Sequence, residues 1–526
     1  MLPPRCHPTA FSNRLTLHSI SVHSRTFLPS RIRTKQRSLV TLAIETSCDD
    51  TAVAVLEKSA EGRTRLLFNE RVSSDNRAFK GIHPMVTVEG HNTALGPLVE
   101  RALESLRENE NGVDGVGAGA GSSGVASKGS SVVVTDDKRI KKWKKKIRVP
   151  DFVCATRGPG IMTNLSVGLN VAKGLALAWD VPFVGVHHMQ AHALTPRLVD
   201  ALESEQGQQE VLSTSTSTST SPSPSPSPSP NFPFLSLLVS GGHTQLILST
   251  TLTNHRILAT TGDIAIGNLL DQTARVILPP ALLESSPDVS YGRLLEAFAF
   301  PPGADTPADY DAFFTPAASR QDEIQEVPSG YGWTVPLPFR NSRKLAYSFS
   351  SIHSHVHNIA AAANNRNTDN NNHDESNLDS PSSSSSDNMP LEERRALARH
   401  TLRAAFQHLA SRLILALQDS PSLQPSSPEN EPIKTIVVAG GVASNRFLMH
   451  VLRTTLAARG FADMRIVSPP LELCTDNAAM IAWAGMEMFE AGYRTELSVR
   501  PIAKWPMDPD VGGGILGAGG WVRDEE

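Results

Sequence analysis

The chain is poor in cysteine and has no long apolar run. Only four cysteines occur among its 526 residues, and none forms a CxxC pair. This argues against a zinc ribbon or a secreted disulfide framework and favours a reducing compartment. No stretch of eighteen apolar residues occurs, so no membrane span is expected. With 40% apolar and 19% charged residues, the composition is that of a globular enzyme with a substantial core.

Acidic residues are absent from the first 37 positions, where six arginines and one lysine stand among serines and threonines. This composition is typical of a mitochondrial transit peptide, and a disordered basic tail is the alternative. We therefore predict a mitochondrial matrix protein and leave residues 1–37 out of the fold. The formal net charge of -4 becomes more negative without these cations, so any binding of nucleic acid needs a local basic surface.

Low-complexity segments rich in Gly, Ser, Thr, Pro or Asn interrupt the chain. They cannot bury enough apolar surface to order themselves, so we expect disorder there. The expected insertions lie at about 109–146, 362–389 and 420–431, with a linker at 213–231 and a flexible tail at 511–526. These breaks predict one domain over residues 38–212 and another over 232–510.

The same apolar pattern occurs twice. Each copy opens with three short apolar runs joined by polar turns, at 39–46, 51–56 and 66–72 and again at 234–239, 244–248 and 257–260. Each copy continues with helical periodicity and then with a buried strand that runs into a Gly-rich turn. This order is similar to the paired ribonuclease-H-like domains of actin and the sugar kinases (the ASKHA fold). We predict an α/β fold with two such domains facing each other across a cleft.

The segment from His188 to His192 places two imidazoles four residues apart, on one face of a predicted helix, where both can bind one metal ion. An incidental pair is the alternative. A zinc-protease site is excluded, because Met189 stands where HExxH has its catalytic Glu. Asp476, just before the apolar helix at 478–489, is either the N-cap of that helix or a third ligand.

Two Gly-rich turns, at 240–244 and 440–445, follow predicted strands and are candidate phosphate cradles. Asp49 and Asp50 occupy the matching turn of the first copy and could orient a nucleophile or take its proton. Plain polar turns are the alternative in each case. The basic run at 138–148 either binds RNA phosphates or is a solvated loop.

Read together, these motifs resemble the TsaD family, and they recur in order over most of residues 39–506. The matching segments are Glu45 to Thr51, Gly158-Pro159-Gly160, His187 to His192, Val239 to Gln245, Asp263 to Arg275, Tyr347 to Ser350, Ala439 to Arg446, Cys474 to Ala482 and Ser498 to Pro501.

The resemblance implies a specific activity and a specific set of site residues. It implies that threonylcarbamoyl passes from threonylcarbamoyl-adenylate, made by a partner synthase, to N6 of adenosine 37 in mitochondrial tRNAs that read codons beginning with adenine, with release of AMP. It also implies a homodimer and one divalent ion per subunit, with zinc or iron preferred over magnesium. The implied metal ligands are His188, His192 and Asp476; the implied nucleotide contacts are Leu238, Val239, Ser240, Gly241, Gly242, Asp271, Gly292 and Asn445; and Asp49 and Asp50 are the implied catalytic residues.

Several positions depart from the family pattern. Asp50 and Met85 each stand where the family usually has Glu, and Ala478 stands where it usually has Gly. The usual Gly-Gly-Pro is replaced by Tyr291-Gly292-Arg293. A Phe-Ser-Gly-Leu-Lys motif is altered at Ser351 and His353. None of these changes removes an implied metal ligand. A kinase-like or ATP-hydrolysing enzyme of the same superfamily, or a non-catalytic nucleotide-binding protein, remains the alternative function.

Overall fold

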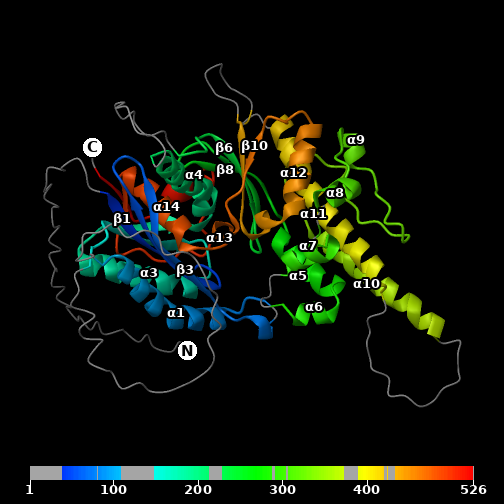
Figure 1. Ribbon diagram of the computed structural model, residues 1–526, viewed down its shortest axis with the longest axis horizontal. Coiled ribbons are helices and arrows are strands. Elements are labelled where there is room, and N and C mark those ends of the chain that lie inside the picture. The colour runs from blue at the N-terminus through cyan, green and yellow to red at the C-terminus, as the bar shows by residue number, and fades with distance from the viewer. Residues whose placement is uncertain are drawn as a thin grey trace, which may run out of the picture. The chain divides into compact units, whose positions relative to one another are not determined.

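The computed structural model describes most of the chain from Ser38 onward (Figure 1). The described residues are 38–79, 81–107, 147–212, 228–286, 291–301, 303, 306–371, 389–419, 423 and 433–524. The predicted transit peptide, the insertion at 109–146 and most of the other low-complexity segments lie outside them. Within the described ranges, no helix has the length and apolar character needed to cross a bilayer.

The first sheet has five strands in the order β3-β2-β1-β4-β5. The strands are β1 (Leu39–Glu45), β2 (Asp50–Lys58), β3 (Thr64–Ser73), β4 (Phe152–Gly158) and β5 (Phe183–His187). The first three pair as an antiparallel meander, while β4 and β5 are parallel to β1. The register pairs Ile44 with Val53 on one side and with Ala155 on the other.

The second sheet repeats this topology in the order β10-β9-β6-β7-β8. Its strands are β6 (Phe234–Val239), β7 (Thr244–Ser249), β8 (His255–Thr260), β9 (Thr435–Ala439) and β10 (Arg465–Val467). Again three strands form a meander, and two more lie parallel to the first of them. The predicted internal repeat and the predicted ribonuclease-H-like α/β fold class are therefore confirmed.

Side chains of the first sheet alternate between two helical layers, as a two-residue strand period requires. Leu42 and Ile44 pack with α1 (Pro84–Ser105) and α3 (Met162–Trp179), whereas Ala43 packs with α4 (His188–Leu212) and α14 (Ala478–Glu490). Although α14 comes late in the chain, it packs against α4 and against the strands of the first sheet. The boundaries drawn from linear order placed α14 with the second sheet, so here the spatial grouping differs from the predicted one.

The second sheet packs against its own helical core, which is built around α11 (Leu391–Asp419). Phe406, Leu409 and Leu413 are fully buried there, as their spacing predicts. The other elements of this half are α5 (Ile266–Ile277), α6 (Pro280–Glu284), α7 (Gly292–Ala299), α8 (Thr306–Phe313), α9 (Arg320–Glu323), α10 (Ser350–Asn371), η3 (Gly441–Ser444), α12 (Arg446–Ala458) and α13 (Leu471–Cys474). Because α10 reaches Asn371, it overlaps the start of the insertion expected at 362–389.

The C-terminal segment is folded as far as Arg523, which corrects the expectation of a flexible tail from residue 511. Strand β12 (Trp521–Arg523) pairs with β11 (Tyr493–Thr495), and the short helix α15 (Gly514–Gly517) precedes it. Trp521 Nε1 donates to the carbonyl of Ile515 at 3.0 Å. Strand pairing and one aromatic side chain order this segment.

Two fully buried imidazoles in the second half predict a loss of stability in acid. Burial lowers the pKa of His255 to about 4 and that of His408 to about 3. The unfolded chain therefore takes up these protons at a higher pH than the folded one. Stability that is present above about pH 6.5 falls as the pH decreases toward about 4.

For His255 alone, we expect roughly 2 kcal/mol less unfolding free energy at pH 5 than at pH 7. Urea unfolding at the two pH values measures the difference, and His255→Gln should reduce it. An unchanged pH dependence in that variant would contradict the assignment of the buried imidazole as a source of the effect.

Candidate metal and nucleotide site

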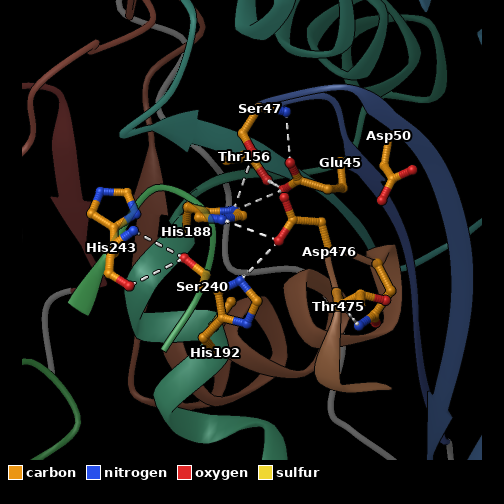
Figure 2. A network of polar contacts seen from close by, with 12 residues as sticks. Glu45, Ser47, Asp50, Thr156, His188, His192, Ser240, His243, Thr475 and Asp476 are labelled. Atoms are coloured by element: carbon orange, nitrogen blue, oxygen red, sulfur yellow. Dashed lines mark hydrogen bonds and ion pairs between the residues drawn. The ribbon is translucent and has the colours of Figure 1, made fainter. Parts of the chain in front are cut away.

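Three predicted ligands converge where β5 runs into α4. His192 Nε2 lies 3.0 Å and His188 Nε2 lies 3.5 Å from the same oxygen, Oδ1 of Asp476. One ligand atom from each residue falls within 4.8 Å of the other two. Figure 2 shows the two imidazoles and the carboxylate pointing toward one another. Two histidines and one carboxylate form a donor set that suits a divalent ion and leaves coordination positions open for oxygen ligands.

Local structure explains why Asp476 is available to this cluster. The N-cap of α14 is Asn477, whose side chain accepts from the backbone N–H of Met480 at 3.0 Å. The capping role considered for Asp476 thus belongs to its neighbour. Since His188 opens α4 and His192 lies one turn later, both rings face the carboxylate.

Glu45 is a site residue that the sequence reasoning did not assign. Its carboxylate is fully buried at the end of β1 and lies 3.4 Å from Nδ1 of His188. Ser47 N–H donates to it at 2.6 Å, and the Thr156 hydroxyl also donates to it. Because Glu45 binds Nδ1 of His188, Nε2 of the same ring is directed toward Asp476. Acidic partners orient metal-binding histidines in the same way. The available signal was that Glu45 is the one acid in an otherwise apolar run.

The carboxylates of Asp476 and Glu45 make the electrostatic potential at the cluster strongly negative. Burial raises the pKa of Asp476, but His188 and His192 outweigh burial and hold it well below its usual value. Burial lowers the pKa of His188, yet Asp476 and Glu45 raise it to about 9. A pair of carboxylates that attracts a proton this strongly also attracts a cation in its place. The residues present therefore fit a divalent ion.

Asp49 lies beside the cluster, in the turn between β1 and β2, and Asp50 is the first residue of β2. Burial and Asp476 raise the pKa of Asp49. Burial raises that of Asp50 to about 7, although Arg71 and Ser73 oppose the effect. Arg71 Nη1 lies 3.3 Å from Asp50 and donates to the carbonyl of Asp476 at 3.3 Å. Arg71, which the sequence reasoning also missed, thus joins this turn to the loop that carries Asp476.

The glycine turns of the second half meet at the end of β6. A Cβ on Gly440, whose φ is +98°, would lie 2.4 Å from the carbonyl oxygen of Val239, and one on Gly441 would lie 3.8 Å from Thr475. Only glycine allows the approach at position 440, whereas a Cβ at position 441 would make an ordinary contact. The side chains of Leu238 and Val239 are buried in the core, so these two residues offer a ligand only their backbone.

The remaining predicted nucleotide residues form a second group. Asp271 Oδ1 accepts from the backbone N–H of Gly292 at 3.1 Å. One turn after Gly292, the half-buried carboxylate of Glu296 accepts from the N–H of Phe447 at 2.9 Å. Phe447 lies in the first turn of α12, which Asn445 caps by accepting from Leu448 N–H at 2.9 Å. The structure therefore connects Asp271 and Gly292 to the region of Asn445 through Glu296.

Helix α5 packs closely against the turn that begins at Ser240, and Gly267 lies at the contact. A Cβ on Gly267 would lie 2.7 Å from the backbone of Ser240 and Gly241, whereas one on Gly262 would have nothing within 4 Å. Gly267→Ala must displace the turn, so we expect the Kd for AMP to rise by about tenfold or more. Gly262→Ala is the matched control and should bind like wild type. Isothermal titration with AMP measures both, and equal affinities would show that the turn does not hold the nucleotide.

Comparison with known proteins places this geometry in a family. Residues 131–206 and 212–483 match the family model described as "TsaD: tRNA N6-adenosine threonylcarbamoyltransferase". The chain is similar to the mitochondrial tRNA N6-adenosine threonylcarbamoyltransferase of Schizosaccharomyces pombe, with 30% identity over 95% of this chain and 91% of that protein. It is equally similar to the tRNA N6-adenosine threonylcarbamoyltransferase of Brucella anthropi, with 30% identity over 91% of this chain and 99% of the other.

Solved structures resemble the chain more distantly. HypF of T. kodakarensis aligns over 85% of this chain and 47% of its own at 12% identity, with a TM-score of 0.37. The segments that match the family model include the His188–His192 motif, the glycine turns and Asp476. The chain therefore belongs to the TsaD family of tRNA N6-adenosine threonylcarbamoyltransferases.

Proposed function

We propose that this protein transfers the threonylcarbamoyl group from threonylcarbamoyl-adenylate to N6 of adenosine 37 in mitochondrial tRNAs that read codons beginning with adenine. The observation that carries the proposal is the convergence of His188, His192 and Asp476 beside the glycine turns (Figure 2). An acyl-adenylate needs a site for its phosphate and a route for the incoming amine, and this arrangement offers both.

The adenylate would be held mainly by the second half. Backbone N–H groups of Gly241 and Gly242 are accessible, because both residues are exposed and lack a Cβ. His188, His192 and Asp476 would hold a divalent ion, which when bound stabilises negative charge on a phosphate oxygen. Zinc or iron suits two imidazoles and a carboxylate better than magnesium does. Asp271, Gly292 and Asn445 are proposed to contact the nucleoside.

The first half of the protein would orient the nucleophile, which is the N6 amine of the tRNA adenosine. The N6 amine attacks the carbamoyl carbon, a C–N bond forms, and the C–O bond to phosphate breaks, so AMP leaves with the electron pair. We assign to Asp49 the orientation of the amine and acceptance of its proton, since burial and Asp476 raise the pKa of this carboxylate toward the range of a useful base. Asp50 forms an ion pair with Arg71, and we propose that this pair fixes the position of the Asp50 carboxylate next to the turn. An amine conjugated to a purine is a weak nucleophile, so positioning contributes much of the acceleration.

We also propose the source of the acyl donor, the oligomeric state and the cellular location. Threonylcarbamoyl-adenylate is supplied by a partner synthase, the enzyme works as a homodimer, and residues 1–37 direct it to the mitochondrial matrix. The named mitochondrial relative supports the location, and the acid-free first 37 residues support the targeting.

A transfer assay with the full chain tests this function. The protein is incubated with threonylcarbamoyl-adenylate and unmodified mitochondrial tRNAs, and both the modified nucleoside and AMP are measured by mass spectrometry. We expect modification of tRNAs that read codons beginning with adenine, with one AMP released per transfer. ATP turnover without tRNA modification would favour the kinase-like alternative. Nucleotide binding without either activity would favour a non-catalytic protein.

A further inference from the structure

The carbonyl of Cys48, in the middle of the turn between β1 and β2, receives two side-chain contacts from neighbouring helices. Asn164 Nδ2 donates to this oxygen, and His91 Nε2 lies 3.1 Å from it. His91 belongs to α1 and Asn164 to α3, and both side chains are fully buried. Because both lone pairs of one carbonyl are used, the peptide that precedes Asp49 is held in a single plane.

The side chains of His91 and Asn164 each make a further polar contact that fixes their orientation. Thr51 Oγ1 lies 2.8 Å from His91 Nδ1, and Asn164 also donates to Thr87 Oγ1 at 2.9 Å. The hydroxyl of Thr46 in turn donates to the backbone carbonyl of Asn164 at 2.9 Å. A ring nitrogen that faces a carbonyl must carry the proton, so Nε2 of His91 is the donor to the Cys48 carbonyl. In the neutral ring, Nδ1 then accepts from the Thr51 hydroxyl. Burial lowers the pKa of His91, which agrees with a neutral ring.

The same turn carries the groups that face the candidate site. Ser47 Oγ lies 3.3 Å from Nδ1 of His188, and Asp49 and Asp50 follow Cys48 directly. Its backbone is tied to other segments, since the carbonyl of Ser47 accepts from Ile161 N–H and that of Asp49 from Ser74 N–H. The equivalent turn of the second half closes on itself, with Ser240 N–H donating to the carbonyl of His243 at 2.9 Å, and receives one backbone bond from α5, with Gly267 N–H donating to the carbonyl of Ser240 at 3.0 Å. The first turn is held mainly by contacts from other segments.

We propose that His91 and Asn164 are positioning residues for threonylcarbamoyl transfer, because they fix the peptide between Cys48 and Asp49 and so hold Asp49, which follows that peptide, in place. The inference rests on the proposed function and adds two residues to it. Neither side chain touches a substrate. They act through the backbone that carries Asp49, and a displacement of a reacting group by about 1 Å costs on the order of 100-fold in rate.

Substitutions at His91 test the inference in the full-length protein. His91→Leu keeps most of the volume and removes the donor, so kcat for tRNA modification should fall by about 30-fold to 100-fold. The Kd for AMP should change by less than about threefold, because the nucleotide turns lie in the other half. His91→Gln retains an amide N–H that can reach the Cys48 carbonyl and should recover most of the activity.

Leu98→Ala is the matched control, because Leu98 is fully buried on the same helix α1 and makes no polar contact with the turn. It should lower the melting temperature at least as much as His91→Leu and leave kcat close to the wild-type value. All variants are assayed below the lowest melting midpoint.

The outcomes separate the possibilities. Loss of kcat in His91→Leu, recovery in His91→Gln and normal kcat in Leu98→Ala support positioning. Equal losses of kcat in all three, in proportion to stability, would overturn it, as would a His91→Leu enzyme with wild-type kcat or with only a weaker affinity for AMP. Absence of transfer by the wild-type protein would instead refute the proposed function itself.

Discussion

Replacement of His188 by alanine is expected to abolish tRNA modification, with kcat/KM falling by at least about 10³-fold, or roughly 4 kcal/mol. His188 is the central residue of the cluster, since it lies 3.5 Å from Asp476 on one side of its ring and 3.4 Å from Glu45 on the other. Without it, the remaining two ligands cannot retain an ion firmly. Metal content measured by mass spectrometry should therefore fall together with activity.

A matched control is available on a surface helix. His355→Ala removes an exposed imidazole of α10, whose Nδ1 lies 2.7 Å from the carbonyl of Ser351. It should keep wild-type metal content and rate. Adding zinc or iron to His188→Ala should not restore activity. A His188→Ala protein that holds one ion per subunit and modifies tRNA normally would rule out the proposed use of this cluster.

Asp49→Asn is expected to lower kcat for transfer by about 10²-fold to 10³-fold while the Kd for AMP stays nearly constant. The amide has the same shape as the carboxylate but cannot accept the amine's proton. The nucleotide turns belong to the second sheet, so binding of AMP should not depend on this residue. Single-turnover assays with saturating threonylcarbamoyl-adenylate measure the chemical step directly.

Asp180→Asn serves as the control for Asp49→Asn. Asp180 ends α3 in a left-handed conformation with φ of 54°, a position where asparagine is well tolerated. It should leave both kcat and Kd unchanged. If Asp49→Asn instead lost AMP binding and kept kcat, the carboxylate would belong to the nucleotide side of the site and its assignment to the amine would be wrong.

Much of the fold follows from local pattern. The three apolar runs of each half predicted the two meanders, because strand formation depends on alternation and on turn residues that are adjacent in sequence. The spacing of His188 and His192 likewise predicted one helical face, since a four-residue interval on a helix places side chains above one another. Such features need no knowledge of distant parts of the chain.

The sequence by itself therefore determined the duplicated α/β plan, the histidine pair and the family. Only the tertiary structure decided that Asn477 takes the helix cap and leaves Asp476 for the histidines, that Glu45 lies behind His188, and that α14 returns to the first sheet. The physical reason is that these contacts join residues far apart in the chain. Local propensity cannot choose between a cap and a ligand one position away, because burial and partners from other elements make that choice.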